Sequence, residues 1–163
     1  MLPLIRPATS ADLQAIQRLL RETWHATYAA LYGAGEVEAI SCRWHAIEAL
    51  AQQLAHPNSV FLVAEQAGAI IATSLAHEIE PGVIKLSRLY VLPSNQSQGL
   101  GARLMRETLA GFDPANRIRL EVAELNTGAI RFYERHGFKL ASTVEYDGGP
   151  VARSLIYERR LAT

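Results

Sequence analysis

The chain has 163 residues, 49% of them apolar, so its length and composition fit one domain with a sizeable core rather than a disordered segment. Its 16 basic and 16 acidic residues balance, which disfavours a nucleic-acid binder because phosphate neutralisation needs surplus Lys and Arg. One cysteine, no basic leader and no apolar run near the roughly 18 residues of a membrane span lead us to expect a cytoplasmic protein that binds no membrane.

The chain begins with a predicted strand, Leu2–Arg6, and a helix follows it. Thr9 stands three residues before Asp12, a spacing typical of the capping box that begins a helix. Apolar residues then recur at helical spacing, and the pattern stays mostly helical as far as His56. Within this region, Ser41 is expected to be the N-cap of the last helix.

Strands predominate after residue 58. Short apolar or alternating runs between turn residues predict strands at 60–64, 69–79, 83–92, 118–122, 138–146 and 151–158. Helices are predicted at 99–110 and 126–136, and a turn at 147–149 joins the last two strands into a hairpin. This order predicts an α+β fold in which helices flank a mixed sheet.

The loop after the predicted strand 83–92 carries the pattern Gln-x-x-Gly-x-Gly, from Gln96 to Gly101, and opens a helix. The first amides of a helix lack intrahelical partners and the helix dipole favours negative charge there, so a pyrophosphate fits such a loop. The glycine order differs from a Rossmann fingerprint, and no Gly-Lys-Ser/Thr follows as in a Walker loop. Alone, so short a pattern more often marks a packing turn than a ligand site.

A second motif follows, and its distinctive residues are Asn126, Ala129, Tyr133 and Gly137-Phe138. Together the two motifs resemble the GNAT superfamily of acetyl-CoA-dependent N-acetyltransferases, whose acyl-CoA loop reads Gln/Arg-x-x-Gly-x-Gly/Ala. The opening 5–12 also resembles the family's first strand and helix start, and the resemblance is weakest from 34 to 55. It implies a single N-acetyltransferase domain over 1–163 with a three-layer fold around a mostly antiparallel sheet.

The resemblance also implies a binding site for acetyl-CoA. In the family, the strand before the loop separates from its neighbour at a bulge, and the pantetheine arm pairs with the exposed main chain. Here that strand segment is 89–91, and the amide of Val91 would face the thioester oxygen. The residues expected to bind this cosubstrate are Leu89, Tyr90, Val91, Gln96, Ser97, Gln98, Gly99, Leu100, Gly101, Ala102 and Asn126.

The implied reaction is direct attack of an amine on the thioester. Tyr133 is the expected general acid that protonates the departing thiolate, and its alternative role is to pack its ring in the core. Many family members carry a glutamate base on the strand before the loop, but the matching residue here is Lys85. The base therefore stays open among a water relay and four side chains: His77, Glu78, Ser87 and Glu121.

The amine acceptor also stays open, between a small amine, a polyamine, an amino acid derivative and a peptide N-terminus or lysine. Trp24 and Tyr28 share one helical stripe and are expected either to border the acceptor pocket or to pack in the core. Cys42 is expected to be a half-buried structural residue, and no histidine spacing suggests a metal.

Two further questions are left open by the residues. Homodimers are common among family members, but no feature of this chain requires one. A non-catalytic acyl-CoA-binding regulatory module is the alternative function, favoured by the missing strand glutamate.

Overall fold

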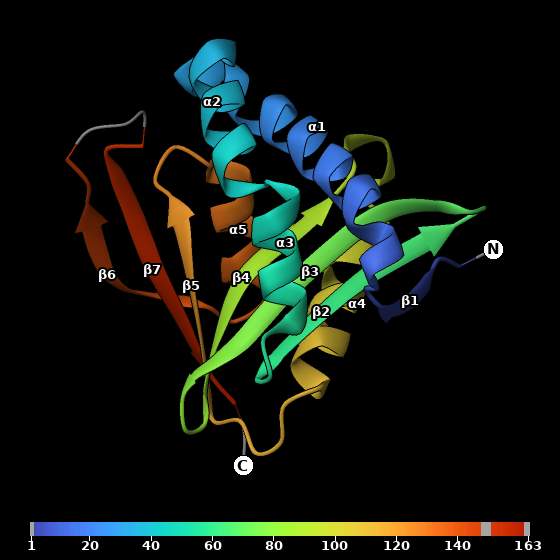
Figure 1. The fold of residues 1–163 in the computed structure, drawn as a ribbon. Coiled ribbons are helices and arrows are strands. Elements are labelled where there is room, and N and C mark those ends of the chain that lie inside the picture. Colours follow the sequence, from blue (N-terminus) through green and yellow to red (C-terminus); the bar gives the residue numbers. More distant parts are fainter. Residues whose placement is uncertain (1, 148–150, 162–163) are drawn as a thin grey trace.

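The computed structural model describes residues 2–147 and 151–161, which form one sheet with the strand order β1-β2-β3-β4-β5-β7-β6 (Figure 1). The strands are β1 (Leu4–Pro7), β2 (Ser59–Gln66), β3 (Ala69–Glu80), β4 (Val83–Val91), β5 (Arg117–Ala123), β6 (Lys139–Glu145) and β7 (Arg153–Arg160). β4 and β5 run parallel, and the other neighbours in this described sheet are antiparallel. The predicted mixed, mostly antiparallel sheet is confirmed.

The helices are α1 (Leu13–Tyr32), α2 (Ala34–Trp44), α3 (Ile47–Ala55), α4 (Leu100–Ala110) and α5 (Thr127–Arg135). The first three cover one face of the sheet, and α4 and α5 cover the other (Figure 1). Short 3₁₀ turns at 10–12 and 93–95 precede α1 and follow β4. Within the ranges that the structure describes, no helix is both long and apolar enough to cross a bilayer.

The predicted strands, and the two predicted helices after residue 58, match observed elements with ends shifted by at most two residues. The capping box is also confirmed, because the Thr9 amide donates to Asp12 Oδ2 at 2.8 Å. The closing hairpin forms between β6 and β7. Residues 148 and 149 of its predicted turn lie outside the described ranges.

Two predictions for the helical region are wrong. Ser41 lies buried inside α2, where its hydroxyl is 2.9 Å from Nδ1 of His45, and α3 begins without a side-chain cap. The serine therefore bonds a side chain one turn along the same helix instead of a free amide. Cys42 is exposed rather than half-buried, since it lies on the outer face of α2 and donates its thiol proton to Glu38.

The core lies on both faces of the sheet, and β2 shows how. Phe61 and Val63 pack against buried residues of α1 and α3, whereas Leu62 and Ala64 pack against Leu104 and its neighbours on α4. Alternate side chains thus point to opposite faces, and both sets are removed from water. This burial on both faces fixes the position of the neighbouring strands β3 and β4. The candidate site lies beside these strands.

Candidate active site

The strands β4 and β5 pair only over their first residues. Their described register runs from Val83 opposite Arg117 to Lys85 opposite Arg119, and the strands then diverge (Figure 1). From residue 86 to 91, β4 keeps its pairing with β3 on the other side. We call this segment the open edge of β4, and it matches the separated strand that the resemblance implied.

A β-bulge at Ser87 accompanies this separation. Leu75 on β3 lies opposite Arg88 while Ala76 lies opposite Leu86, so Ser87 is an extra residue on β4. Such a bulge bends its strand, increases the local twist and redirects the side chains that follow it.

The bulge exchanges the two faces of β4. Leu86 packs into the core cluster of α4, and beyond the bulge Leu89 joins that same cluster. Arg88 instead lies on the opposite face, with its guanidinium carbon 5.2 Å from the ring centroid of Phe61, and Tyr90 follows it there. Without the extra residue, Arg88 would point into the apolar layer under α4.

The open edge presents main-chain groups to the gap between β4 and β5. The amide of Leu92 donates to the carbonyl oxygen of Ile71 on β3 at 2.9 Å. Because antiparallel residues alternate in direction, the N–H and C=O groups of Leu89 and Val91 point away from β3. Accordingly, the side chain of Gln96 reaches the Val91 carbonyl at 2.9 Å.

The loop beyond the open edge leads to a helix terminus without a side-chain cap. Gly99 is the N-cap of α4 with φ of 78°, and no side chain among the described residues caps its first turn. A Cβ added to Gly99 would meet no atom within 4 Å, so the backbone conformation, not crowding, favours glycine. Gly101 lies against the Phe132 ring, where an added Cβ would make an ordinary contact at 3.6 Å.

Three tyrosines from separate elements converge near the open edge: Tyr28 of α1, Tyr90 of β4 and Tyr133 of α5. Burial is the main cause that raises all three pKa values, and each phenol is close enough to feel the charge of another. The pKa of Tyr90 rises to about 12, and that of Tyr133 lies well above its usual range. Tyr133 therefore keeps its proton at neutral pH, and no described group hydrogen-bonds its hydroxyl.

Asn126 joins two of these elements. Its Oδ1 caps α5 by accepting from the Ala129 amide at 3.2 Å, and its Nδ2 donates to the Tyr28 hydroxyl at 3.0 Å. Asn126 is thus the N-cap of α5, while its contact with a cosubstrate stays a prediction.

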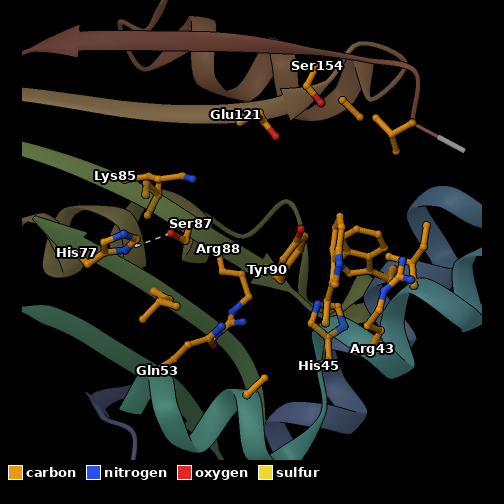
Figure 2. Close-up of a pocket in the computed structure, with 18 of the residues that line it drawn as sticks. Arg43, His45, Gln53, His77, Lys85, Ser87, Arg88, Tyr90, Glu121 and Ser154 are labelled. Carbon is orange, nitrogen blue, oxygen red and sulfur yellow. Dashed lines mark hydrogen bonds between the residues drawn. The ribbon is translucent and has the colours of Figure 1, made fainter. Parts of the chain in front are cut away.

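A cleft of about 990 Å³ opens beside the separated strands, on the face covered by α1, α2 and α3 (Figure 2). Trp24 and Tyr28 line it, and their residues are only 8% and 6% exposed. Their rings also pack against each other in a tilted arrangement, with centroids 4.8 Å apart and planes at 52°. The predicted core packing of these two rings is confirmed, while their contact with an acceptor stays a prediction.

The cleft brings together three of the four candidate bases. His77, Ser87 and Glu121 line it together with Lys85, whereas Glu78 does not. Glu121 accepts a hydrogen bond from the Tyr146 hydroxyl at 2.7 Å. Burial, and then the nearby cationic groups, lower the pKa of His77.

Arg88 is a cleft residue that the sequence analysis did not single out. Its residue is 8% exposed, and its Nη2 donates to Oε1 of Gln53 on α3 at 2.7 Å. Burial lowers the pKa of its guanidinium to about 10, which still leaves it charged at neutral pH. The sequence contains a signal for its orientation: apolar residues move from even positions, 84 and 86, to odd positions, 89 and 91.

Comparison with known proteins gives this geometry a family context. The model of the acetyltransferase (GNAT) family matches residues 13–138. An uncharacterized N-acetyltransferase of Mycobacterium bovis is 34% identical over 95 residues, which are 57% of this chain and 61% of that relative's length. The matched part thus spans less than two thirds of this relative.

Two further similarities extend over almost the whole chain. Spermidine N(1)-acetyltransferase of Thermoplasma acidophilum is 27% identical over 164 residues, covering 94% of this chain and 97% of its own. The crystal structure of PaiA N-acetyltransferase from Thermoplasma acidophilum, in complex with coenzyme A, has a TM-score of 0.86 at 24% identity and covers 99% of this chain and all of that one. The latter similarity shows the same fold.

Proposed function

Because the chain belongs to the GNAT family of acetyltransferases, we propose that it is an N-acetyltransferase that moves the acetyl group of acetyl-CoA to a primary amine by direct attack. A nitrogen–carbon bond forms, the carbon–sulfur bond breaks, the amine loses one proton and the sulfur gains one. The observation that carries the proposal is the open edge of β4 beside the uncapped N-terminus of α4.

The main chain would hold the cosubstrate, which supplies a thioester activated toward attack. An extended pantetheine arm suits the main-chain groups of Leu89 and the amide of Val91, which point away from β3, as an added strand suits a sheet edge. The Val91 carbonyl already accepts a hydrogen bond from Gln96. The first-turn amides of α4, behind Gly99, suit a diphosphate. The amide of Val91 would stabilise charge that grows on the thioester oxygen. In support, the Thermoplasma structure of the same fold is a coenzyme A complex.

Tyr133 would supply the proton that the departing sulfur takes. Its raised pKa keeps the phenol protonated at neutral pH, and its hydroxyl makes no hydrogen bond within the described part of the chain. A raised pKa also makes a phenol a weaker acid. Burial also raises the pKa of a thiol held beside it, which favours transfer of the proton to the departing sulfur.

Glu121 would take the proton that the amine gives up, through water in the cleft. It is the predicted carboxylate base that lines the cleft, and Figure 2 shows it on β5, across from Lys85 and Arg88 of β4. A carboxylate at this point can take the role of the strand glutamate, whose position is occupied by Lys85 in this chain. Apart from the missing strand glutamate, no observation favours the non-catalytic alternative.

The cleft favours a small acceptor over an extended peptide. Its volume of about 990 Å³ lies in the range of roughly 300–1,000 Å³ that is usual for small-molecule sites. Trp24 and Tyr28 form one of its walls, as expected for a pocket that holds a small molecule. The spermidine acetyltransferase among the relatives makes polyamines one class to test.

Calorimetry and a thiol-release assay test the proposal in two steps. We expect coenzyme A to bind and to raise the thermal unfolding midpoint of the protein. We then expect free thiol to appear from acetyl-CoA only when an accepted amine is present. Absence of binding at millimolar coenzyme A contradicts the cosubstrate site. Binding without amine-dependent thiol release across a broad amine panel contradicts the catalytic function.

A further inference from the structure

We infer that the acceptor is an amine that also carries a carboxylate, and that the guanidinium of Arg88 binds this carboxylate. The inference rests on the proposed function and names the class of its acceptor. The starting observation is that Arg88 is charged, is buried beside the cleft and has no described acidic partner.

Arg88 lacks an anionic partner. Its described hydrogen bond goes to the neutral amide oxygen of Gln53, and its buried Nε has no hydrogen-bond partner in the part of the chain that the structure describes. No carboxylate lies within ion-pair distance of its guanidinium among residues 2–147 and 151–161. Buried charges in folded proteins are normally paired, because an unpaired charge loses its hydration without compensation.

Arg6 shows how the same molecule treats another partly buried arginine. Its guanidinium contacts Asp12 at 2.8 Å and Glu65 at 3.1 Å. These two acidic partners raise the pKa of Arg6, whereas burial lowers the pKa of Arg88. The contrast identifies Arg88 as a binding group whose counter-charge comes from outside the chain.

Arg88 lies where a ligand can reach it. It lines the cleft together with Gln53 and His45, and Figure 2 shows all three on the side formed by β4 and the helices α2 and α3. Burial, and then the charge of Arg88, lower the pKa of His45 to about 4, so this ring is neutral at pH 7. His45 therefore does not add a positive charge beside the buried guanidinium of Arg88.

The other charged residues of the cleft also favour an acceptor that carries a carboxylate. Arg43 and Lys85 also line it, while its acidic residues, Glu121 and Asp147, come from β5 and from the residues after β6. A polyamine would bring its cationic chain beside three positive side chains. An amine that also carries a carboxylate can instead direct its negative group toward Arg88 and its amino group toward Glu121. These two side chains lie on facing walls of the cleft (Figure 2).

Matched acceptor pairs test the inference in the wild-type enzyme. The first pair is 4-aminobutyrate and 1,4-diaminobutane, the second is an L-amino acid and its amide, and spermidine is assayed beside them. We expect kcat/KM to be about tenfold to a hundredfold higher for the preferred carboxylate than for its uncharged or cationic counterpart. Equal or faster acetylation of the diamine, the amide and spermidine would overturn the inference. A phosphonate analogue, 2-aminoethylphosphonate, preferred over β-alanine would overturn the carboxylate assignment.

Variants locate the recognition at Arg88. Arg88→Met removes the charge at similar length and should reduce the carboxylate preference to about twofold or less, whereas Arg88→Lys should retain part of it. Arg106→Met, an exposed arginine on α4 across the sheet, is the matched control and should keep the full preference. Retention of the full preference in Arg88→Met would overturn the role of this residue. Coenzyme A affinity shows that each variant is folded, and if Arg88→Met does not fold, Arg88→Gln replaces it.

A binding measurement separates this inference from the proposed function. Calorimetric titration of the coenzyme A complex with 4-aminobutyrate and 1,4-diaminobutane requires no turnover. Carboxylate binding that Arg88→Met abolishes, without thiol release from any amine, contradicts the catalytic function but retains the site. Acetylation of amines with no preference for the carboxylate contradicts the site but retains the function. Absence of both binding and acetylation contradicts both.

Discussion

The open edge of β4 and the cleft beside it adjoin each other but present different chemistry. The open edge presents main-chain groups of Leu89 and Val91, supported by Gly99 at the start of α4. The cleft presents side chains, chiefly Arg88, Gln53 and Glu121, from elements far apart in the sequence. A main-chain site depends on backbone shape and tolerates most side chains, whereas a side-chain site depends on each residue identity. The two regions should therefore respond differently to substitution and to pH.

Tyr133→Phe should have the largest effect, because it removes the hydroxyl that we propose as the proton donor. We expect kcat to fall about 100-fold or more, with the affinity for coenzyme A changed by less than about twofold, since the main chain of the open edge is intact. Steady-state kinetics and calorimetry measure the two quantities. Tyr157→Phe, a core tyrosine of β7, is the control. Unchanged turnover in Tyr133→Phe would remove its catalytic role.

Acidification should destabilise the cleft side through His45. Its folded pKa of about 4 lies below the unfolded value of 6.5, so the unfolded chain binds an extra proton between these pH values. The free energy of unfolding should fall as pH drops through this window, by up to about 3 kcal/mol from this group.

His45→Asn tests this difference. Denaturant unfolding between pH 7 and 4 should show a smaller loss of stability in the variant than in the wild type, because the titrating ring is gone. The main-chain groups of the open edge do not titrate in this range. An identical pH slope in both proteins would show that His45 is not the group responsible.

Glu121→Gln should reduce kcat/KM by about tenfold to a hundredfold at neutral pH, where a primary amine with a pKa of about 10.4 is mostly protonated. The defect should shrink as pH rises toward 10, because more of the amine is then already neutral. A pH profile of kcat/KM measures this change. Glu78→Gln, which alters a carboxylate outside the cleft, should change the rate by less than about twofold. A defect that is constant with pH would contradict proton transfer to Glu121.

Gly99→Ala and Gln98→Ala should have the smallest effects, and they compare backbone with side chain inside one loop. Alanine at position 99 must adopt φ of 78°, which costs about 1 kcal/mol and should weaken coenzyme A binding several-fold. Gln98→Ala should leave the affinity unchanged. Calorimetry on both variants decides whether backbone or side chain matters here. An equal loss in Gln98→Ala would show that a side chain holds the cosubstrate.

Much of the fold could be predicted because local patterns reflect local structure. Alternation along β2 and turn residues such as Gly68 and Gly82, both with φ of 79°, mark the strands. The ends of the helices in the segment 34–55 were harder to predict from the sequence. There Ser41 has the chemistry of a cap, but the tertiary fold places it inside α2 beside His45.

The two halves of the site differ in the same way. The open edge and its loop lie in one continuous stretch, so a short motif is enough to find them. The cleft depends on Arg88, Gln53 and His45, which meet only after α2 and α3 fold onto β4. The shift of apolar positions on β4 indicates a bulge, but it does not show which side chains the redirected Arg88 will meet.

In the proposed arrangement, a single strand serves two substrates through different atoms of neighbouring residues. Mutation at position 88 exchanges a side chain on one face of β4 and leaves the amides of positions 89 and 91 in place. Acceptor choice can thus diverge among descendants of such a protein while the acyl donor remains the same. For the protein engineer, positions 43, 45, 53 and 88 are the ones to randomise, with the segment 96–102 held constant.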